Sequence, residues 1–498
     1  MSFNIMGIGV GEGGGRLAMA MASSGVNIGA LNTNAGDLAG LTKIVESKKL
    51  LLSISDGGSG KDPNFVREAM KDASVRAKVV EFIQKLLAST PLYSKCPHCD
   101  NEDQVLDIEA IGTPHLCSFC NKEFGITEVK KNDSMKHNYI FLFVCLGGGS
   151  GSGLIIDMVD ICTKNFNLPI AVVCTLPDNT EDTTTKVNAV SIFKELYNLY
   201  AKDGIVSPLI LIDNQKMFET FNLPIGSMYP TINKSITNLI DKFNKFSNQS
   251  SKYMTTVDTM DTGRLLSLGG CCTMGKFIVG NPTSKEDKYS VVVPHPLDLD
   301  AIEEAMKNST FVDGFDLASA RGVGIIAVAP EHFLEDENVS TCIRYAFGKA
   351  KEIIGDGLVF RGQYTDNSKN YLEFYLIYNG LKYPEERFAR MWTEIKEGKN
   401  LLRTKLDRID EVPYDIKVES ASVGNNFRKL QQLARPEDQP QPVFNVATYE
   451  RKPKVPKRPC NNCYLDPISR RSTGVYRKGG PSPFTGKVCP VCQGKGKI

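Results

Sequence analysis

The feature that most constrains how this chain can fold is a glycine run at residues 147–153, Gly-Gly-Gly-Ser-Gly-Ser-Gly. It directly follows eight apolar or aromatic residues, 139–146, which predict a fully buried strand. It precedes the stretch 154–159, which predicts the start of a helix. Glycines placed there leave backbone N–H groups unobstructed at the positive end of a helix dipole. The pattern therefore indicates a phosphate-binding loop, because flexible linkers do not lie between a buried strand and an apolar helix.

Around this loop, strand-like runs alternate with helical stretches up to about residue 280, which predicts a parallel sheet covered by helices. A long helix is expected over 230–246. Residues 281–400 predict a second unit in which strands flank helical segments such as 338–354. The strands expected along the chain are 4–9, 27–32, 50–54, 139–146, 170–176, 208–213, 322–330 and 371–379.

Two other glycine-rich segments match familiar motifs only in part. Residues 9–16 follow the first strand and fit G-x-G-x-x-G, the dinucleotide fingerprint. That fingerprint requires a ribose-binding acid after the second strand, where this chain has Asn32-Thr33-Asn34. Residues 56–63 contain Gly60-Lys61, as a Walker loop does, but Asp62 occupies the position of the required hydroxyl. Neither motif is complete.

Together, GGGSGSG, the first glycine loop with Asn32-Thr33-Asn34, and the loop at 56–61 resemble the signature of the tubulin/FtsZ superfamily, most of all its plasmid and phage tubulin-like branch. The resemblance covers about residues 3–90 and 136–400. It implies an α/β fold: a tubulin/FtsZ-like GTPase domain, with a parallel sheet flanked by helices, and a smaller α+β activation domain. The nucleotide-binding residues that it implies in the glycine loops are Gly11, Glu12, Gly13, Gly14, Arg16, Asn34, Gly57, Gly58, Ser59, Gly60, Gly147, Gly148, Gly149, Ser150, Gly151 and Ser152.

The same resemblance implies a ribose and a guanine site for GTP or GDP, bound with Mg²⁺. Glu181, in Pro177-Asp178-Asn179-Thr180-Glu181, matches the family's ribose contact, and Asn214 and Asn233 match its two guanine-reading asparagines. Amide side chains both donate and accept hydrogen bonds, which suits a guanine edge. Where FtsZ has an arginine after the ribose loop, this chain has Thr185-Lys186.

Residues 257–264 resemble the FtsZ synergy loop, N-x-D-x-x-D, with Thr256 in place of the asparagine. The resemblance implies that Asp258 and Asp261 are catalytic and position water beneath the nucleotide of a neighbouring subunit. Hydrolysis would then require head-to-tail self-assembly into a filament. Two alternatives stay open: a nucleotide-binding scaffold without significant hydrolysis, and a Rossmann-type oxidoreductase, which the missing ribose acid disfavours.

Eight of the fourteen cysteines form four Cys-x-x-Cys pairs, which predict two small zinc modules with four cysteine ligands each. Seventeen residues separate the first two pairs and twenty-five separate the last two. Iron is the alternative metal. The other six cysteines lie mostly in apolar segments, which indicates a reducing, cytoplasmic environment. The predicted ligands of structural Zn²⁺ are Cys96, Cys99, Cys117, Cys120, Cys460, Cys463, Cys489 and Cys492.

Charge is unevenly distributed along the chain. Residues 451–498 hold twelve Lys or Arg and one Asp, although the net charge of the whole chain is +2. The basic tail predicts a nucleic-acid partner or an acidic adaptor protein. No apolar run approaches the roughly 20 residues of a membrane span, so no membrane partner is expected. The expected domains are a GTP-binding domain (1–280), a zinc-ribbon insertion (91–135), an activation domain (281–402), a helical extension (403–435), a Pro-rich basic linker (436–459) and a terminal four-cysteine zinc module (460–498).

Overall fold

The computed structural model forms two compact units, Met1–Pro436 and Glu437–Ile498. Within the first unit one sheet spans both sides of residue 280, so the predicted division there does not interrupt the sheet. The predicted linker 436–459 lies outside the described residues, as does the predicted helical extension beyond residue 407. The structure describes residues 3–22, 24, 26–54, 58–89, 92–99, 102–105, 111–117, 122–131, 137–221, 224–247, 249, 251, 256–282, 290–407, 463–465, 472–477 and 484–488.

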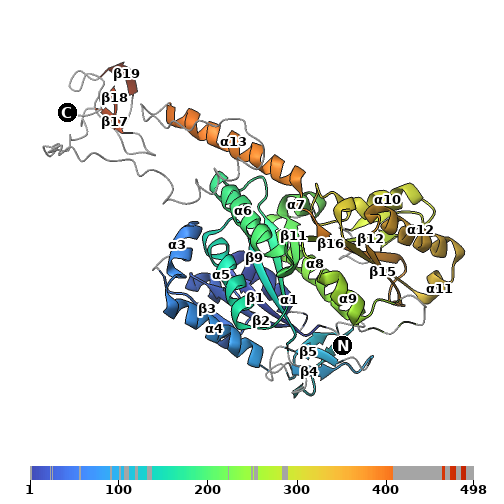
Figure 1. Cartoon of the computed structure of the whole chain (residues 1–498). Coiled ribbons are helices and arrows are strands. Elements are labelled where there is room, and N and C mark those ends of the chain that lie inside the picture. The colour runs from blue at the N-terminus through green and yellow to red at the C-terminus, as the bar shows by residue number, and fades with distance from the viewer. Residues whose placement is uncertain are drawn as a thin grey trace. The chain divides into compact units, whose positions relative to one another are not determined.

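Eleven strands of the described chain form the central sheet, in the order β15-β14-β16-β12-β11-β10-β9-β1-β2-β3, with β13 paired to β12 (Figure 1). From β12 to β3 all neighbours are parallel. β16 is antiparallel to both β12 and β14. The strands are β1 (Ile5–Val10), β2 (Asn27–Asn32), β3 (Lys49–Leu51), β9 (Tyr139–Cys145), β10 (Ile170–Leu176), β11 (Val206–Asp213), β12 (Cys271–Val279), β13 (Val291–Val293), β14 (Gly322–Ala329), β15 (Leu358–Thr365) and β16 (Leu372–Leu381).

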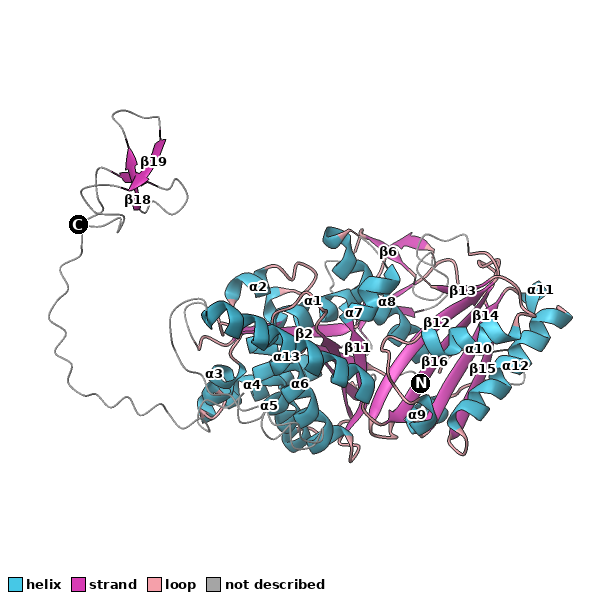
Figure 2. Ribbon diagram, turned by 90° about the horizontal axis from the view of Figure 1, so that it is seen from above, coloured by secondary structure: helices cyan, strands magenta, loops and turns pink. Residues whose placement is uncertain are grey.

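Helices cover both faces of the sheet because its central strands are apolar on both sides (Figure 2). In β9, alternate residues enter different cores: Leu142 packs with α3 to α6, and Phe143 packs with α1 and α8. The helices are α1 (Gly11–Ala22), α2 (Ala35–Ala39), α3 (Pro63–Ala69), α4 (Ala73–Ala88), α5 (Gly149–Asn165), α6 (Thr183–Leu196), α7 (Asn214–Phe221), α8 (Ile225–Phe246), α9 (Thr259–Leu266), α10 (Leu299–Asn308), α11 (Glu331–Leu334), α12 (Glu337–Ile354) and α13 (Glu385–Asp407).

The predicted elements are present; most of their ends agree with the prediction to within two residues, and two differ by three or more. α8 begins at Ile225 and includes Pro230, whereas the sequence predicted that the proline would start the helix. β3 ends at Leu51, three residues before the predicted end. It lies at one edge of the sheet, where it pairs with β2 alone.

A separate group of short strands lies between α4 and β9. β4 (Leu92–Lys95) pairs with β5 (Glu102–Val105) and β8 (Lys130–Lys131), and β6 (Pro114–Leu116) pairs with β7 (Glu123–Gly125). Strands β17 (Cys463–Leu465), β18 (Ser472–Arg477) and β19 (Phe484–Val488) form the antiparallel sheet of the second unit. Among the helices described, none is long and apolar enough to cross a bilayer.

Candidate nucleotide, catalytic and metal sites

The predicted nucleotide-binding segments meet at the carboxyl-terminal edge of the sheet. β1, β2, β9, β10 and β11 run parallel, so the loops that follow them emerge at this one edge. Those loops contain the first glycine run, Asn34, the GGGSGSG segment, Glu181 and Asn214. The topology therefore brings together residues that are about 200 positions apart in the sequence.

The two main glycine loops touch each other. Gly11 has a φ of 75°, and a Cβ placed on it would lie 2.6 Å from the backbone nitrogen of Gly151. Gly147 has a φ of 116° and is packed against Thr185. Any larger residue at position 11 or 147 would be strained and would push the loops apart. Gly13 and Gly14 pack equally closely, on Cys145 and on the Phe143 carbonyl oxygen of β9.

Ser150 joins three loops at the start of α5. Its hydroxyl lies 2.6 Å from Thr33 Oγ1 and 3.1 Å from Ser59 Oγ. Asn34 caps α2 by accepting a hydrogen bond from Asp37 N, and its side chain lies beside Gly58. These contacts connect the loops after β2, β3 and β9. Gly57 lies outside the described residues.

The amino terminus of α5 fits a phosphate group. Of the helices described, seven are capped by an Asn or Asp side chain: α2, α3, α4, α6, α9, α10 and α12. The N-cap of α5 is Gly148, and no side chain makes a capping hydrogen bond to the backbone there. Gly148 is exposed, and nothing lies within 4 Å of where its Cβ would be. Unsatisfied N–H groups at a helix terminus beside open space are suited to an anion.

The predicted ribose loop is acidic and partly buried. Asp178 is buried and accepts hydrogen bonds from Thr180 N and Oγ1. Burial, followed by the charge of Asp178, raises the pKa of the half-buried Glu181 above its ordinary value. Lys186, which stands near the position of the FtsZ arginine, is buried and donates to the Asn179 carbonyl oxygen at 2.9 Å. The Lys186 ammonium group therefore holds the backbone of the predicted ribose loop through this hydrogen bond.

Asn214 begins α7 and Asn233 lies in α8, both half-buried. Sequence reasoning missed Tyr229, which lies one helical turn before Asn233 on the same helix and is 39% exposed. Burial, followed by the charges of Asp178 and Glu181, raises the Tyr229 pKa to about 12. An exposed aromatic ring close to the ribose loop and Asn233 can stack on a purine. The spacing of Tyr229 and Asn233, four residues apart, could have indicated that both lie on one face of a helix. The predicted helix began at residue 230, however, and so left Tyr229 out.

Arg387 ties the ribose and guanine loops to α13. Its guanidinium is 2% exposed and donates to Asp213 at 2.6 and 3.2 Å and to the Pro177 carbonyl oxygen at 3.1 Å. Pro177 and Asp213 are the residues at which β10 and β11 give way to those loops. The sequence offers no signal for this pair, because its members are 174 residues apart.

Glu12 and Arg16 pair with each other at the surface.

The predicted catalytic acids lie at the other edge of the sheet. Asp258 is exposed and caps α9, accepting a hydrogen bond from Asp261 N at 2.8 Å. Thr259 Oγ1 of α9 donates to the Ser247 carbonyl oxygen just after α8, at 3.2 Å, and Asn244 in the last turn of α8 bonds to the Phe3 backbone just before β1, so both acids lie near the amino-terminal edge of the parallel strands. The structure therefore does not bring Asp258 and Asp261 to the glycine loops of the same chain.

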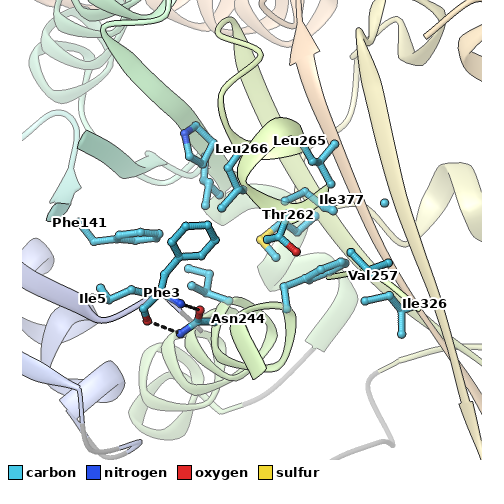
Figure 3. Close-up of a pocket in the computed structure, with 16 residues that line it drawn as sticks. Phe3, Ile5, Phe141, Asn244, Val257, Thr262, Leu265, Leu266, Ile326 and Ile377 are labelled. Atoms are coloured by element: carbon cyan, nitrogen blue, oxygen red, sulfur yellow. Dashed lines mark hydrogen bonds between the residues drawn. The ribbon is translucent and has the colours of Figure 1, made fainter. Parts of the chain in front are cut away.

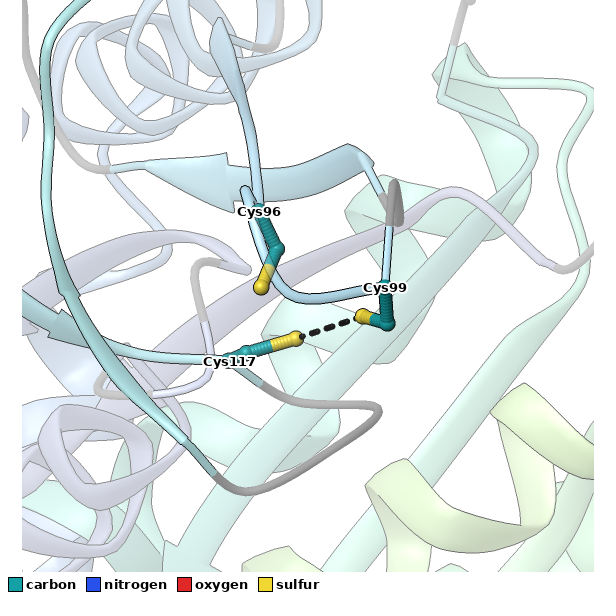
Figure 4. Close-up of side chains that lie close together, drawn as sticks. All are labelled: Cys96, Cys99 and Cys117. Atoms are coloured by element: carbon teal, nitrogen blue, oxygen red, sulfur yellow. Dashed lines mark hydrogen bonds between the residues drawn. The ribbon is translucent and has the colours of Figure 1, made fainter.

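Three of the predicted metal ligands converge (Figure 4). The Sγ atoms of Cys96, Cys99 and Cys117 lie within 4.8 Å of one another, and those of Cys99 and Cys117 are 3.5 Å apart. Zinc–sulfur bonds of about 2.3 Å in a tetrahedron imply sulfur separations of about 3.8 Å, so the cluster fits zinc. Cys463 begins β17. Cys120, Cys460, Cys489 and Cys492 lie outside the described residues.

No protein-family model matches the sequence, and a search of curated proteins finds no match. Several solved structures are similar to the chain. The protofilament of Bacillus thuringiensis serovar israelensis TubZ in its GTPγS form is 16% identical, with a TM-score of 0.61, and the match covers 82% of this chain and 94% of that one.

The GTPγS-bound protofilament of CetZ2 from Haloferax volcanii is 18% identical, with a TM-score of 0.55, 79% of this chain and 99% of that one being covered. TubZ of Clostridium botulinum phage c-st, without its C-terminal tail, is 15% identical, with a TM-score of 0.52 and coverages of 80% and 98%. The fold of this chain is thus tubulin/FtsZ-like, a mostly parallel sheet flanked by helices, and it is similar to that of TubZ proteins, among them a type III plasmid segregation TubZ and the phage protein.

Proposed function

We propose that this chain is a cytoplasmic, cytoskeletal GTPase that assembles head-to-tail into filaments and hydrolyses GTP where two subunits meet. One observation carries the proposal: the candidate nucleotide loops and the Asp258–Asp261 pair lie at opposite ends of the parallel strands of the sheet. β11 has eight residues, so about 26 Å of strand separates the two edges. The acids cannot reach a nucleotide in their own chain, but in a head-to-tail pair they would face that of the next.

The comparisons support this assignment. The similar TubZ and CetZ2 structures are described as protofilaments in GTPγS form or with GTPγS bound. Those proteins match along more than nine-tenths of their own length. The similarity therefore includes both edges of the sheet, which are the parts that a longitudinal contact needs.

Each residue in the site has a role in this proposal. The N–H groups of the glycine loops at α1 and α5 hold the phosphates, and Glu181 binds the ribose hydroxyls. Asn214 and Asn233 read the guanine edge, and the Tyr229 ring stacks on the base. If Mg²⁺ binds beside the glycine loops, it would neutralise part of the phosphate charge. None of the residues in these roles contributes a covalent intermediate.

The hydrolytic step requires residues from two chains. Asp258 and Asp261 of one subunit orient a water molecule in line with the γ-phosphate held by the next. A bond forms between the water oxygen and the γ-phosphorus as the bond to the β–γ bridging oxygen breaks, and the water's proton passes to the released phosphate. The products are GDP and inorganic phosphate. The protein contributes position and electrostatics, as is usual for phosphoryl transfer.

The test is to measure phosphate release and sedimentation of the purified full chain with GTP over a range of protein concentrations. We expect both to appear together above a threshold concentration, because the site is completed only by assembly. Asp261→Asn should keep the sedimented polymer and slow release on the order of 100-fold. Phosphate release proportional to protein concentration, without a threshold, would contradict a shared site.

A nucleotide-binding scaffold is the second candidate. Two observations favour it: Thr256 replaces the asparagine of the synergy loop, and Asp258 is already engaged as the cap of α9. Under this function the chain would bind GTP and sediment, yet release no phosphate at any concentration.

Under either function, the partner that we propose for the basic tail is a nucleic acid or an acidic adaptor.

A further inference from the structure

The metal insertion, described by the structure at residues 92–99, 102–105, 111–117 and 122–131 of the predicted 91–135, leaves the body of the protein through a closed neck. The Ser89 carbonyl oxygen lies 3.2 Å from His137 Nε2, on the other side of the insertion. Asn27 Nδ2 donates to Ser89 Oγ at 2.6 Å and to the Leu86 carbonyl oxygen at 3.0 Å. Asn27 is the first residue of β2. Both ends of the insertion are therefore held at the amino-terminal edge of the sheet.

A short chain of contacts links this neck to the proposed catalytic helix. Asn138 N donates to the Asn4 carbonyl oxygen at 3.0 Å, and Asn4 N donates to Asn138 Oδ1 at 2.8 Å. Phe3, the residue before Asn4, exchanges two backbone hydrogen bonds with the Asn244 side chain of α8, at 2.8 and 2.9 Å. A Cβ placed on Gly263 of α9 would lie 3.7 Å from the Phe3 ring.

The close-up in Figure 3 shows the side chains around Phe3 that connect the neck to α9. Phe3 lies between Phe141 of the sheet and Leu266 of α9, and it lines a cavity of about 30 Å³ together with Thr262. The cavity is apolar and holds little more than one water molecule. In Figure 1, β4, β5 and α9 all lie at the lower edge of the sheet.

We infer that the metal insertion is an assembly element that contacts the nucleotide-carrying edge of the next copy of this chain. The inference rests on the proposed function, because head-to-tail assembly places the amino-terminal edge of one subunit over the carboxyl-terminal edge of the next. Anything that projects from the neck then lies at that joint. The insertion is continuous with the proposed interface, since Phe3 and Asn4 alone separate its neck from α9.

The composition of the insertion favours a protein surface over a nucleic acid. It contains eight Asp or Glu and four Lys, and four zinc-bound thiolates would add further negative charge. An acidic module is repelled by the continuous phosphate backbone of a nucleic acid, whereas the nucleotide-carrying edge also offers the exposed cations Arg16 and Lys61. A second copy of the chain is the partner that the topology supplies.

Metal would control this contact. The described apolar core of the insertion consists of Cys96, Cys117, Phe124 and Ile126, with Cys99 and Val129 packed on it. So small a core depends on a metal for its stability. Loss of the metal should therefore unfold the insertion and weaken assembly, while the nucleotide loops at the other edge are unaffected.

The first experiment replaces residues 91–135 of the full chain with an Asn-Gly turn. The variant should bind a fluorescent GTP analogue as the wild type does, because the neck ends already lie side by side. Its threshold concentration for GTP-dependent sedimentation should rise by about tenfold or more, the loss of one modest contact surface. Cys117→Ser, with the insertion present, should raise the threshold in the same direction. Unchanged thresholds in both variants, with wild-type assembly intact, would overturn the inference alone.

The second experiment locates the contact. A photoreactive benzoylphenylalanine is placed at Lys130, which is exposed on β8, and, as the matched control, at Lys78, which is exposed on α4 over a face of the sheet. With GTP above threshold, position 130 should cross-link to peptides containing residues 58–62 or 178–182 of another chain, and position 78 should not. Cross-links from position 130 confined to its own chain would overturn the inference. Failure of the wild type to sediment or release phosphate at any concentration would overturn the proposed function and this inference together.

Discussion

At Gly148, a substitution can affect ligand binding without affecting the stability of the protein. Its φ is −70°, an ordinary value, and nothing lies within 4 Å of its Cβ position. Gly148→Ala should therefore leave the melting temperature unchanged and weaken GTP binding by about tenfold, because the methyl group projects beside the first turn of α5. Equilibrium titration with a fluorescent GTP analogue, paired with a thermal melt, measures both effects.

The matched control is Gly348→Ala in α12, which also has nothing within 4 Å and lies outside the candidate nucleotide loops. It should not change GTP affinity. Gly11→Ala should differ from both, because its φ of 75° and its contact with Gly151 strain the protein itself. Equal affinities for wild type and Gly148→Ala would show that no phosphate sits at the start of α5.

Asp258 has two functions that substitution can separate. Its carboxylate caps α9, and the proposal makes the same carboxylate catalytic. Asp258→Asn keeps a good cap and removes the charge, so stability should stay near that of the wild type while phosphate release falls on the order of 100-fold. Asp258→Ala removes the cap as well and should cost a further ~1 kcal/mol of unfolding free energy. Denaturant melts and single-turnover phosphate release provide the two measurements; wild-type turnover by Asp258→Asn would exclude a catalytic charge.

At the scale of elements, the neck between α4 and β9 should be sensitive to pH. The pKa of His137 is lowered below the ordinary 6.5, mainly by burial and to a smaller extent by the charge of Lys48. Hydrogen bonds to the Ser89 and Asn4 backbones act in the opposite direction and only partly offset this decrease. The unfolded state then binds the proton more readily than the folded state. Stability of the neck is complete above about pH 6.5 and is lost as the pH falls below that value.

Hydrogen exchange at pH 7.5 and 5.5 checks this expectation. After correction for intrinsic rates, amides at the end of α4 and the start of β2 should exchange severalfold faster at the lower pH. His137→Gln, which cannot be protonated, should show no such difference. A pH effect of the same size in the variant would assign it to another group.

The sequence predicted the elements whose apolar character is continuous. β2 and β10 have the predicted ends, because both strands are buried on both faces and almost wholly apolar inside, with Asn at each end of β2 and Pro on each side of β10. The start of α8 was mispredicted because proline commonly occupies the first helical turn. That error also concealed Tyr229. Contacts such as Ser150 with Thr33, or Arg387 with Asp213, depend on tertiary structure and leave no local pattern.

For the whole molecule, we expect two zinc ions per chain. Elemental analysis of gel-filtered protein should give about two equivalents, because each four-cysteine module holds one ion. Cys117→Ser and Cys463→Ser should each remove one, and the double variant should remove both. Neither single substitution should alter GTP affinity, since the described nucleotide loops contain none of the predicted ligands. Iron in place of zinc, or one equivalent in the wild type, would contradict the prediction.

The closed neck also bears on how such a chain acquires new parts. Because Ser89 and His137 lie in contact, the route from α4 to β9 can be closed by a turn or extended by a folded module without moving either element. The entropic cost of a longer loop grows only slowly with its length. The neck is therefore a permissive graft point, where a domain can be gained, exchanged or lost in a single genetic event while the sheet beneath keeps its register.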